Sequence, residues 1–505
     1  MEQTCTNPQH KHHVTSRADR IPLIQKIAYS IGGLVNNMQA AALGSMVIIL
    51  NLGLGMNPAL VGLIGTIPRA IDAIIDPFVG YSSDNTRTRW GRRRPFIFFG
   101  AIFSGILFAL MFQLYKGHSE SFYFWYFLGI QILFLIGFTC YSIPWIALGY
   151  EITPDYHERT RLQGASNFVA QFAWIIAPWF FLIMNNKGMF TDIVQGARHL
   201  SIVVGAFILF GGILPAIFNK EHFGNLPRPE RVKGFKGFAK DFFSGFTVTL
   251  KCRPFVKLCA ITFLIFNGFM LASAFTAYVI FFYVFGGNYE KGGALLGWFG
   301  SISSICTFCV IFLATWVSTK IGKRKAFLIF IPISIVGYAL KWVGYNPAHP
   351  YLLLVAAPFI SFGLGSLFTL VGSMIADVCD FDELTSGTRR EGMFGAVYWW
   401  IIKLGMAGAS LLSGVLLNMT GFDVKLGAGQ TASALFWMRI CDIGIPMLAS
   451  IAAIIIMMRF DITEDRAYSI RAEVERRRGE RRSAERPAAE KPAKDRREKD
   501  RRGRA

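Results

Sequence analysis

The chain has 505 residues, of which 53% are hydrophobic, 15% aromatic and only 17% charged, and its formal net charge is +20 at pH 7. A soluble domain of this length would expose far more charge, so the composition excludes an ordinary soluble protein and indicates many membrane spans. The positive charge would suit a partner such as a nucleic acid, but its distribution along the chain does not.

Apolar blocks follow one another along the chain, separated by joints that are polar or rich in Gly and Pro. About 20 apolar residues in a helix cross a hydrocarbon core about 30 Å thick. We therefore predict an all-α polytopic membrane protein with twelve transmembrane helices. The predicted spans are residues 24–50, 58–82, 95–115, 122–149, 163–185, 199–219, 255–285, 293–319, 325–345, 350–376, 393–419 and 433–458.

Basic residues gather on one side of these spans. The N-terminal segment, residues 1–20, and the joints after every second span hold most of the loop Lys and Arg. Since such residues are retained in the cytoplasm, we predict a multi-pass protein of the cell membrane with both termini cytoplasmic. The tail, residues 460–505, carries sixteen Lys or Arg against eight acids from Arg466 onward. We interpret it as a disordered or helical arm near anionic lipid headgroups, with no nucleic-acid partner.

The spans divide into two similar halves. The longest internal polar segment, residues 220–253, is predicted to link an N-terminal bundle, residues 21–219, to a C-terminal bundle, residues 254–459. The sequence GRRRPF at 91–96 recurs as GKRKAF at 322–327, and the acidic-to-basic joint at 151–161 recurs at 377–390. Parallel repeats of six helices predict a central cavity between two bundles that move about it.

Three charged residues, Arg69, Asp72 and Asp76, interrupt the apolar run at residues 67–78. On a helix they share one face, and two carboxylates one turn apart can contact the same small cation or share a proton. An ionisable group in mid-membrane costs about 2.5 to 3.5 kcal/mol, so these residues need mutual pairing and usually a function. The plainer alternative is that Arg69 only neutralises a buried acid pair. The excess of acids favours a cation site.

The second span ends in a strongly basic joint, GYSSDNTRTRWGRRRPF at residues 80–96. An acid at a helix end opposite arginines can form charge-assisted bonds to a neighbouring helix, and this latch must break when the cytoplasmic side opens. The predicted cytoplasmic gate comprises Asp84, Arg87, Arg92, Arg93 and Arg94, with Glu151, Arg161, Asp377 and Arg389 as counterparts.

Together with this joint, the acid pair, the sequence YSIPWIAL at 141–148 and SGTRREG at 386–392 give the chain a family resemblance. It resembles the glycoside-pentoside-hexuronide:cation symporters of the major facilitator superfamily, the family of the melibiose carriers. The resemblance extends to about Arg459 and leaves out both tails. It implies two six-helix bundles and alternating access.

The resemblance also implies roles for single residues. Asp72 and Asp76, with Thr139 from the fourth span, would bind the coupling cation, and Lys403 in the eleventh span would couple the two halves. The spacing itself, and not the resemblance, predicts that Arg69, three residues before Asp72, keeps the remaining charge paired when one acid binds a proton. The alternative for Lys403 is that its ammonium group reaches the membrane interface. Its place midway along the span favours coupling.

Departures from the melibiose carriers bear on the solute. Ile75 stands where sodium-using carriers have an asparagine, which removes an oxygen ligand. The acids and the arginine that hold a galactoside in those carriers correspond here to the neutral side chains of Asn37, Ser142 and Asn167. A galactoside is therefore not implied. Aromatic residues near the predicted cavity that could stack on a sugar ring are Tyr29, Trp145 and Trp399.

We therefore predict a secondary transporter, not an enzyme, that imports a sugar, glycoside or uronide with H⁺ or Na⁺ as a monomer in the lipid bilayer. H⁺ is favoured because a proton needs one carboxylate, whereas Na⁺ needs several oxygen ligands. No cofactor and no metal other than Na⁺ is expected. A carrier of a lysolipid or another amphiphile is the first alternative. An intramembrane enzyme is the second, but the spans offer no metal-ligand motif and no nucleophile with a nearby base.

Overall fold

A computed structural model describes residues 20–86, 88–153, 156–221, 249–386 and 391–485. Within these ranges the regular structure is helical, apart from an isolated bridge between Thr88 and Gly91. Twelve helical segments are long and apolar enough to cross a membrane, which confirms the predicted fold class.

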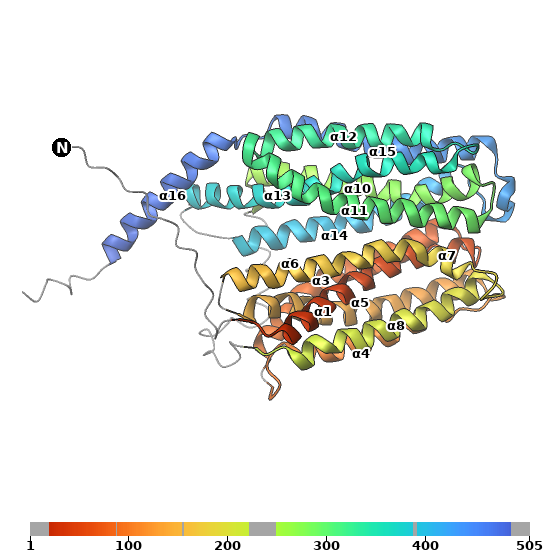
Figure 1. The fold of residues 1–505 in the computed structure, drawn as a ribbon, viewed down its shortest axis with the longest axis horizontal. Helices are drawn as coiled ribbons and strands as arrows, with labels where there is room; N and C mark the ends of the chain where they lie inside the picture. Colours follow the sequence, from red (N-terminus) through yellow and green to blue (C-terminus); the bar gives the residue numbers. More distant parts are fainter. Residues whose placement is uncertain (1–19, 87, 154–155, 222–248, 387–390, 486–505) are drawn as a thin grey trace, which may run out of the picture.

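The helices form two bundles that lie side by side with their axes nearly parallel (Figure 1). The first bundle contains α1 (Leu23–Met46), α2 (Ile49–Leu52), α3 (Pro58–Asn85), α4 (Arg94–Met111), α5 (Glu120–Glu151), α6 (Tyr156–Ile176), η1 (Ala177–Trp179), α7 (Phe180–Met184) and α8 (Ile193–Phe218). The second contains α10 (Arg253–Tyr278), the π-helix η2 (Val279–Val284), α11 (Tyr289–Ile321), α12 (Lys323–Gly344), η3 (Pro350–Val355), α13 (Ala356–Ser386), α14 (Glu391–Met419), η4 (Val424–Gly429) and α15 (Ala432–Met458).

The two bundles repeat the same packing. In the first bundle, α1 packs against α6 and α8, α3 against α5, and α4 against α5 and α8. The corresponding helices of the second bundle pair in the same way, because α10 contacts α14 and α15, α11 contacts α13, and α12 contacts α13 and α15. The internal repeat seen in the sequence is therefore a repeat of structure.

Glycines allow some of these helices to approach closely. A methyl group on Gly105 of α4 would lie 2.7 Å from the carbonyl oxygen of Gly205 on α8. Only a residue without a side chain fits there, as is common where membrane helices associate through backbone contacts.

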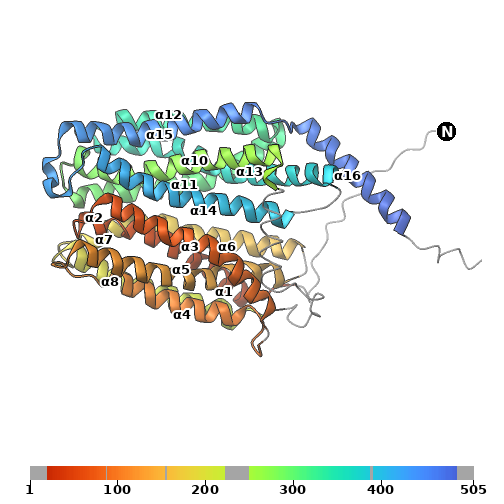
Figure 2. The same cartoon turned by 180° about the vertical axis from the view of Figure 1, so that it is seen from behind.

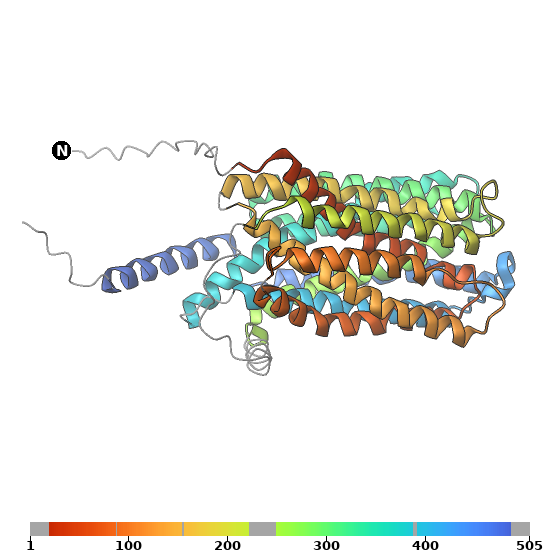
Figure 3. The same ribbon diagram turned by 90° about the horizontal axis from the view of Figure 1, so that it is seen from below.

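We call the end of the molecule where α1 begins the inner end, and the opposite end the outer end. The helix α16 (Glu464–Glu485) extends from the inner end away from both bundles (Figures 2 and 3). Its side chains Ile470 and Val474 are buried in the core of the second bundle, and the helix contacts α13. The predicted tail therefore begins as a helix, and residues 486–505 lie outside the described part of the chain.

The helix bounds modify several predicted elements. The sequence predicts the fifth span as one helix, but α6 passes into the short helices η1 and α7 at Pro178. Proline removes a backbone donor, which explains the break. The second bundle begins at Arg253, within the predicted linker. Residues 222–248 of that linker and residues 1–19 of the N-terminal segment lie outside the described residues.

The bundles contact each other mainly through two helix pairs, α3 with α14 and α6 with α11. Near the outer end the first pair is in backbone contact, since a methyl group on Gly62 would lie 2.7 Å from the carbonyl oxygen of Ser410. Further contacts are the hydrogen bonds from Trp179 to Ser301 (2.8 Å) and from Tyr278 to Asn51 (3.0 Å). Both of these hydrogen bonds lie near the outer end.

Candidate cation and coupling site

The charged residues singled out in the sequence meet at the interface of α3 and α14. The Lys403 ammonium donates to Asp72 Oδ2 at 2.8 Å and also to Asp76 Oδ2. From α5, Thr139 donates its hydroxyl hydrogen to the other oxygen of Asp72, at 2.5 Å. One lysine of the second bundle thus contacts both acids of the first.

The local sequence explains this arrangement. Asp72 and Asp76 are four residues apart on α3, so their side chains point in the same direction. Two prolines, Pro68 and Pro77, lie inside the same helix on either side of the pair. Since proline has no N–H, Pro77 leaves the carbonyl of Ala73 without its usual helical donor, which adds a backbone oxygen close to the acids in sequence.

The site is largely enclosed. The exposed fraction is 11% for the Asp72 side chain and 27% for each of Asp76 and Lys403. All three lie within segments long and apolar enough to span a membrane, where charges are stable only when paired. The ammonium of Lys403 occupies a position between two carboxylates that a small cation could also take.

Arg69 lies three residues before Asp72 on α3 but does not join this cluster of hydrogen bonds. Its guanidinium donates to the sulfur of Met406 on α14, at 3.3 Å. One turn further out, Thr66 donates to the carbonyl oxygen of Ala407 at 2.9 Å. Arg69 therefore lies between the acid pair and the close contact of α3 with α14 near the outer end.

The residues predicted to line a solute cavity fall into two groups. Tyr29 and Trp145 are buried inside the first bundle, stacked with ring centroids 5.0 Å apart, and Trp145 donates to the backbone oxygen of Tyr29. In this conformation they serve helix packing. Asn37 is half-buried and donates to the Ala170 carbonyl at 3.4 Å.

The remaining predicted cavity residues are partly or largely exposed. Ser142 is half-buried and Asn167 exposed. Trp399 is 57% exposed and stacks on Phe368 with ring centroids 6.4 Å apart. These three side chains are at least partly exposed, whereas those of Tyr29 and Trp145 are buried.

Several residues of the predicted cytoplasmic gate fall where the structure gives no side-chain position. Arg87 and Arg389, and the side chains of Asp84 and Glu151, lie outside the described residues. Asp377 forms an ion pair with Lys323 at 2.7 Å, within its own bundle.

The arginines of the basic joint are held by an acid that no sequence motif singles out. The carboxylate of Glu221 accepts the backbone N–H groups of Arg92, Arg93 and Arg94 at 2.9, 2.9 and 3.0 Å. An anion at the start of α4 suits the exposed N–H groups of a helix N-terminus. The side chain of Arg94 donates to the Ala216 carbonyl of α8. This joint is thus fixed to the end of the first bundle.

Arg161 also pairs within its bundle. Its partner is Glu158, at 3.0 Å, which in turn accepts from Lys26 at 2.7 Å. Burial of Glu158 acts to raise its pKa, but the hydrogen bonds from Lys26 and Arg161 outweigh burial and hold the pKa below its usual value. Glu158 lies within the predicted acidic-to-basic joint, where its local sequence does not distinguish it from the neighbouring acids.

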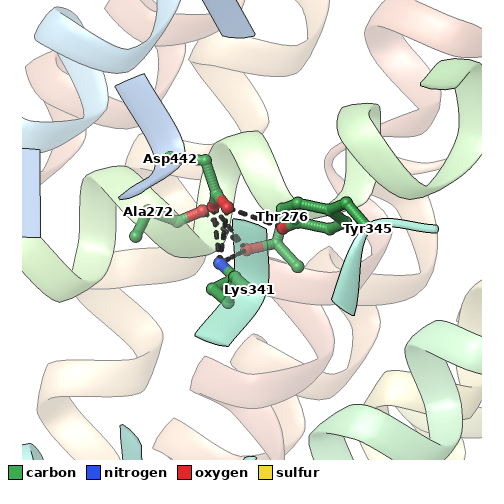
Figure 4. A network of polar contacts seen from close by, with 5 residues as sticks. All are labelled: Ala272, Thr276, Lys341, Tyr345 and Asp442. Atoms are coloured by element: carbon green, nitrogen blue, oxygen red, sulfur yellow. Dashed lines mark hydrogen bonds and ion pairs between the residues drawn. The ribbon is translucent and has the colours of Figure 1, made fainter. Parts of the chain in front are cut away.

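A second buried ion pair, which the sequence did not indicate, lies in the second bundle. Lys341 of α12 and Asp442 of α15 are 2.7 Å apart, and their side chains are 2% and 0% exposed. Thr276 of α10 and the hydroxyl of Tyr345 donate to the same carboxylate, at 2.8 and 2.6 Å (Figure 4). Both carboxylate oxygens of Asp442 are thus hydrogen-bonded within one bundle, as a fixed packing element requires.

A cluster of three or more His, Cys, Asp or Glu that could hold a metal ion is absent from the part of the chain that the structure describes. The candidate cation ligands therefore remain the two carboxylates and one hydroxyl of the site above.

Comparison with known proteins gives matches along most of the chain. The family model described as "MFS/sugar transport protein" matches residues 28–464. The isoprimeverose transporter of Lactiplantibacillus pentosus is 22% identical, with 85% of this chain and 88% of the relative covered. The glucuronide carrier protein homolog of Escherichia coli (strain K12) is 24% identical, with 90% of this chain and 95% of the relative covered.

Two further matches bear on fold and on cargo. The sodium-dependent lysophosphatidylcholine symporter 1 of Gallus gallus is 25% identical, with 92% of this chain and 90% of the relative covered. The crystal structure of a D-xylose-proton symporter superposes with a TM-score of 0.54 at 15% identity, over 86% of this chain and 97% of that one. At this identity the structural match concerns the fold alone.

Proposed function

This chain belongs to the MFS/sugar transport protein family, and we propose that it is a cation-coupled symporter of a sugar, a glycoside or a uronide. The resemblance noted in the sequence is thereby confirmed at the level of the family, and the chain is a multi-pass membrane protein. Because the family consists of transport proteins, the intramembrane enzyme is set aside.

One observation carries the proposal: the ammonium of Lys403 bridges the two acids of the opposite bundle. Lys403 acts as a tethered cation that contacts both Asp72 and Asp76 and, together with the charge of Arg69, balances them while no ion is bound. When a proton or a sodium ion binds to the acids, the attraction between α3 and α14 weakens. Occupancy of the cation site then changes the relative stability of two arrangements of the bundles, which is what coupling requires.

The arrangement of the two bundles corresponds to the half of the transport cycle in which the carrier is closed toward the outside. We place both termini, and hence the inner end, in the cytoplasm, because the basic joints lie there. The close contacts between bundles at the outer end then correspond to a carrier closed toward the outside. Opening the outer end must separate Gly62 from Ser410, which makes the α3 and α14 contact the outer gate.

We propose H⁺ as the coupling ion in preference to Na⁺. Among the described residues, the side chains that offer oxygen ligands to a cation at this site are those of Asp72, Asp76 and Thr139, whereas Ile75, which lies between the two acids in the sequence, offers none. A proton needs only one carboxylate, while Na⁺ requires several oxygens, so the lost amide oxygen weakens Na⁺ binding more.

The alternative cargo is an amphiphile. It is motivated by the relative named as a lysophosphatidylcholine symporter and by the absence of charged sugar ligands at Asn37, Ser142 and Asn167. Its cargo would need an apolar path for an acyl chain as well as a polar site.

Solute counterflow in proteoliposomes tests the proposal. Vesicles containing the purified protein are loaded with an unlabelled neutral glycoside, uronide or lysolipid, and the entry of the same labelled compound is followed. We expect transient accumulation with a saccharide, because exchange without chemical change is the property of a carrier. Exchange of the lysolipid alone would favour the amphiphile, and exchange of none would contradict a carrier of these solutes.

A further inference from the structure

Arg69 is the basic residue of the site that forms no ion pair with any carboxylate among the described residues. A guanidinium has five N–H donors, and its hydrogen bond to Met406 uses one of them on a thioether sulfur, which is a weak acceptor. Arg69 is half-buried within the span Pro58–Gly80. Most of its donor capacity is therefore unused within a segment long and apolar enough to span a membrane.

Other basic residues inside the spans have stronger partners. Lys403 contacts two carboxylates, and Lys341 contacts Asp442 and Thr276. Arg439 lies over the rings of Tyr283 and Trp342 at 4.2 and 4.1 Å. Arg69 is attracted to Asp72, three residues along the same helix, but it does not hydrogen-bond to that carboxylate. Since a cation in a span is stable only when paired, its remaining donors are suited to a further anion.

The charges of the site point to the same conclusion. Arg69 and Lys403 contribute two positive charges, and Asp72 and Asp76 contribute two negative charges, so the unloaded site is neutral. Binding of one H⁺ or Na⁺ leaves an excess of one positive charge. A solute with one negative charge restores neutrality, whereas a neutral solute leaves a net charge to be carried through the membrane.

We propose that Arg69 binds a carboxylate of the solute, and that the solute is an acidic saccharide moved with one monovalent cation in an electroneutral cycle. Guanidinium and carboxylate match in a planar, bidentate geometry that a hydroxyl or an amide does not reproduce. The neutral side chains of Asn37, Ser142 and Asn167 add no carboxylate that would repel such an anion. This inference rests on the proposed symport function and narrows its substrate class.

The first test compares a uronide with its neutral isostere. Uptake of labelled methyl β-glucuronide into proteoliposomes is competed with unlabelled methyl β-glucuronide, with the corresponding glucuronamide and with methyl β-glucoside. We expect the acid to compete about tenfold or more better than either neutral compound, as loss of a charge-assisted hydrogen bond implies. In Arg69→Gln the preference should disappear, and in Arg69→Lys it should return in part.

Arg198→Gln serves as the control, because Arg198 lies over the Tyr115 ring near the start of α8, 4.0 Å from the ring centroid and outside the site. It should keep the preference for the acid. Transport of the neutral glycosides without the uronide would overturn the inference and leave the proposed symporter intact. Better competition by a lysophosphatidate than by the uronide would also overturn it, and exchange of no solute would overturn both proposals.

The second test needs no variant. A potassium gradient with valinomycin imposes a membrane potential, negative inside, on vesicles that hold the wild-type protein. Electroneutral uptake of the uronide should not respond to this potential, whereas coupled uptake of a neutral solute with a cation should accelerate. Acceleration of uronide uptake by the potential would contradict the charge balance at Arg69, even if the Arg69 variants fail to fold.

Discussion

Replacing Lys403 with alanine removes the side chain that, among the described residues, contacts both acids from the opposite bundle. The variant leaves Asp72 and Asp76 as neighbouring negative charges whose side chains are 11% and 27% exposed. Removing one partner of a buried ion pair costs about 3 to 5 kcal/mol. The side chains of Asp76 and Lys403 are each 27% exposed, so solvent screens part of this interaction. We therefore take the cost of removing Lys403 as about 3 kcal/mol, the lower end of that range.

An energy of about 3 kcal/mol corresponds to a change of about a hundredfold in an equilibrium constant. We expect the variant to bind a cation at the acids but to lose the distinction between loaded and unloaded carriers. Uptake against a gradient should therefore fall by about two orders of magnitude, while counterflow of the solute should persist.

The assay is pH-driven accumulation and counterflow in the same vesicles, at equal protein content. Lys325→Ala, which removes an exposed lysine at the inner end of α12, controls for the loss of one positive charge. Accumulation at the wild-type level in Lys403→Ala would refute coupling through this residue. Loss of both activities in a folded variant would show that Lys403 holds the solute instead.

Three further variants test the surrounding structure. Gly414→Ala places a methyl group against the backbone of Pro58 and should force the outer gate apart. A cysteine introduced at the outer end should then react faster with a membrane-impermeant reagent, and unchanged labelling would contradict the assignment of the α3 and α14 contact as the outer gate. Asp442→Asn leaves the buried Lys341 ammonium without its counter-ion and should lower the free energy of unfolding by about 3 to 5 kcal/mol, as measured by thermal denaturation in detergent. Adding Lys341→Met to the same chain should partly restore the stability. Glu158→Gln removes a carboxylate whose pKa is lowered in the folded protein. The loss of stability relative to the wild type should therefore be complete at pH 7 and shrink as the pH falls below 4.5, the ordinary pKa of a glutamate. A loss of stability that does not depend on pH would contradict the ion pair of Glu158 with Lys26.

The sequence predicts those features that depend on local spacing. Hydropathy alone indicates the twelve spans, and the interval between Asp72 and Asp76 is enough to place both acids on one helix face. The contact of Lys403 with these acids joins residues 331 and 327 positions apart, and only the family resemblance suggests it.

The sequence does not predict features that depend on how each helix is rotated about its axis or on which distant residues pair. Tyr29 and Trp145 are plausible cavity residues because they are aromatic, but their helices turn them into the bundle interior, where both are buried. Lys341 and Asp442 lie in different apolar helices, 101 positions apart, so no local pattern indicates that they pair. Glu221 escapes prediction for the same reason, because its partners are backbone groups of a joint 127 to 129 positions away.

The coupling ion is tested by comparing two driving forces on the wild-type protein. Proteoliposomes are given either a pH gradient, acid outside, or a Na⁺ gradient at constant pH, and accumulation of the solute identified by counterflow is measured. We predict concentrative uptake with the pH gradient and little or none with Na⁺, since Asp72, Asp76 and Thr139 can hold a proton but offer few oxygens to a sodium ion. Strict dependence on Na⁺ with no response to pH would contradict the assignment and would indicate that a further oxygen, such as the Ala73 carbonyl left without a donor by Pro77, completes a sodium site.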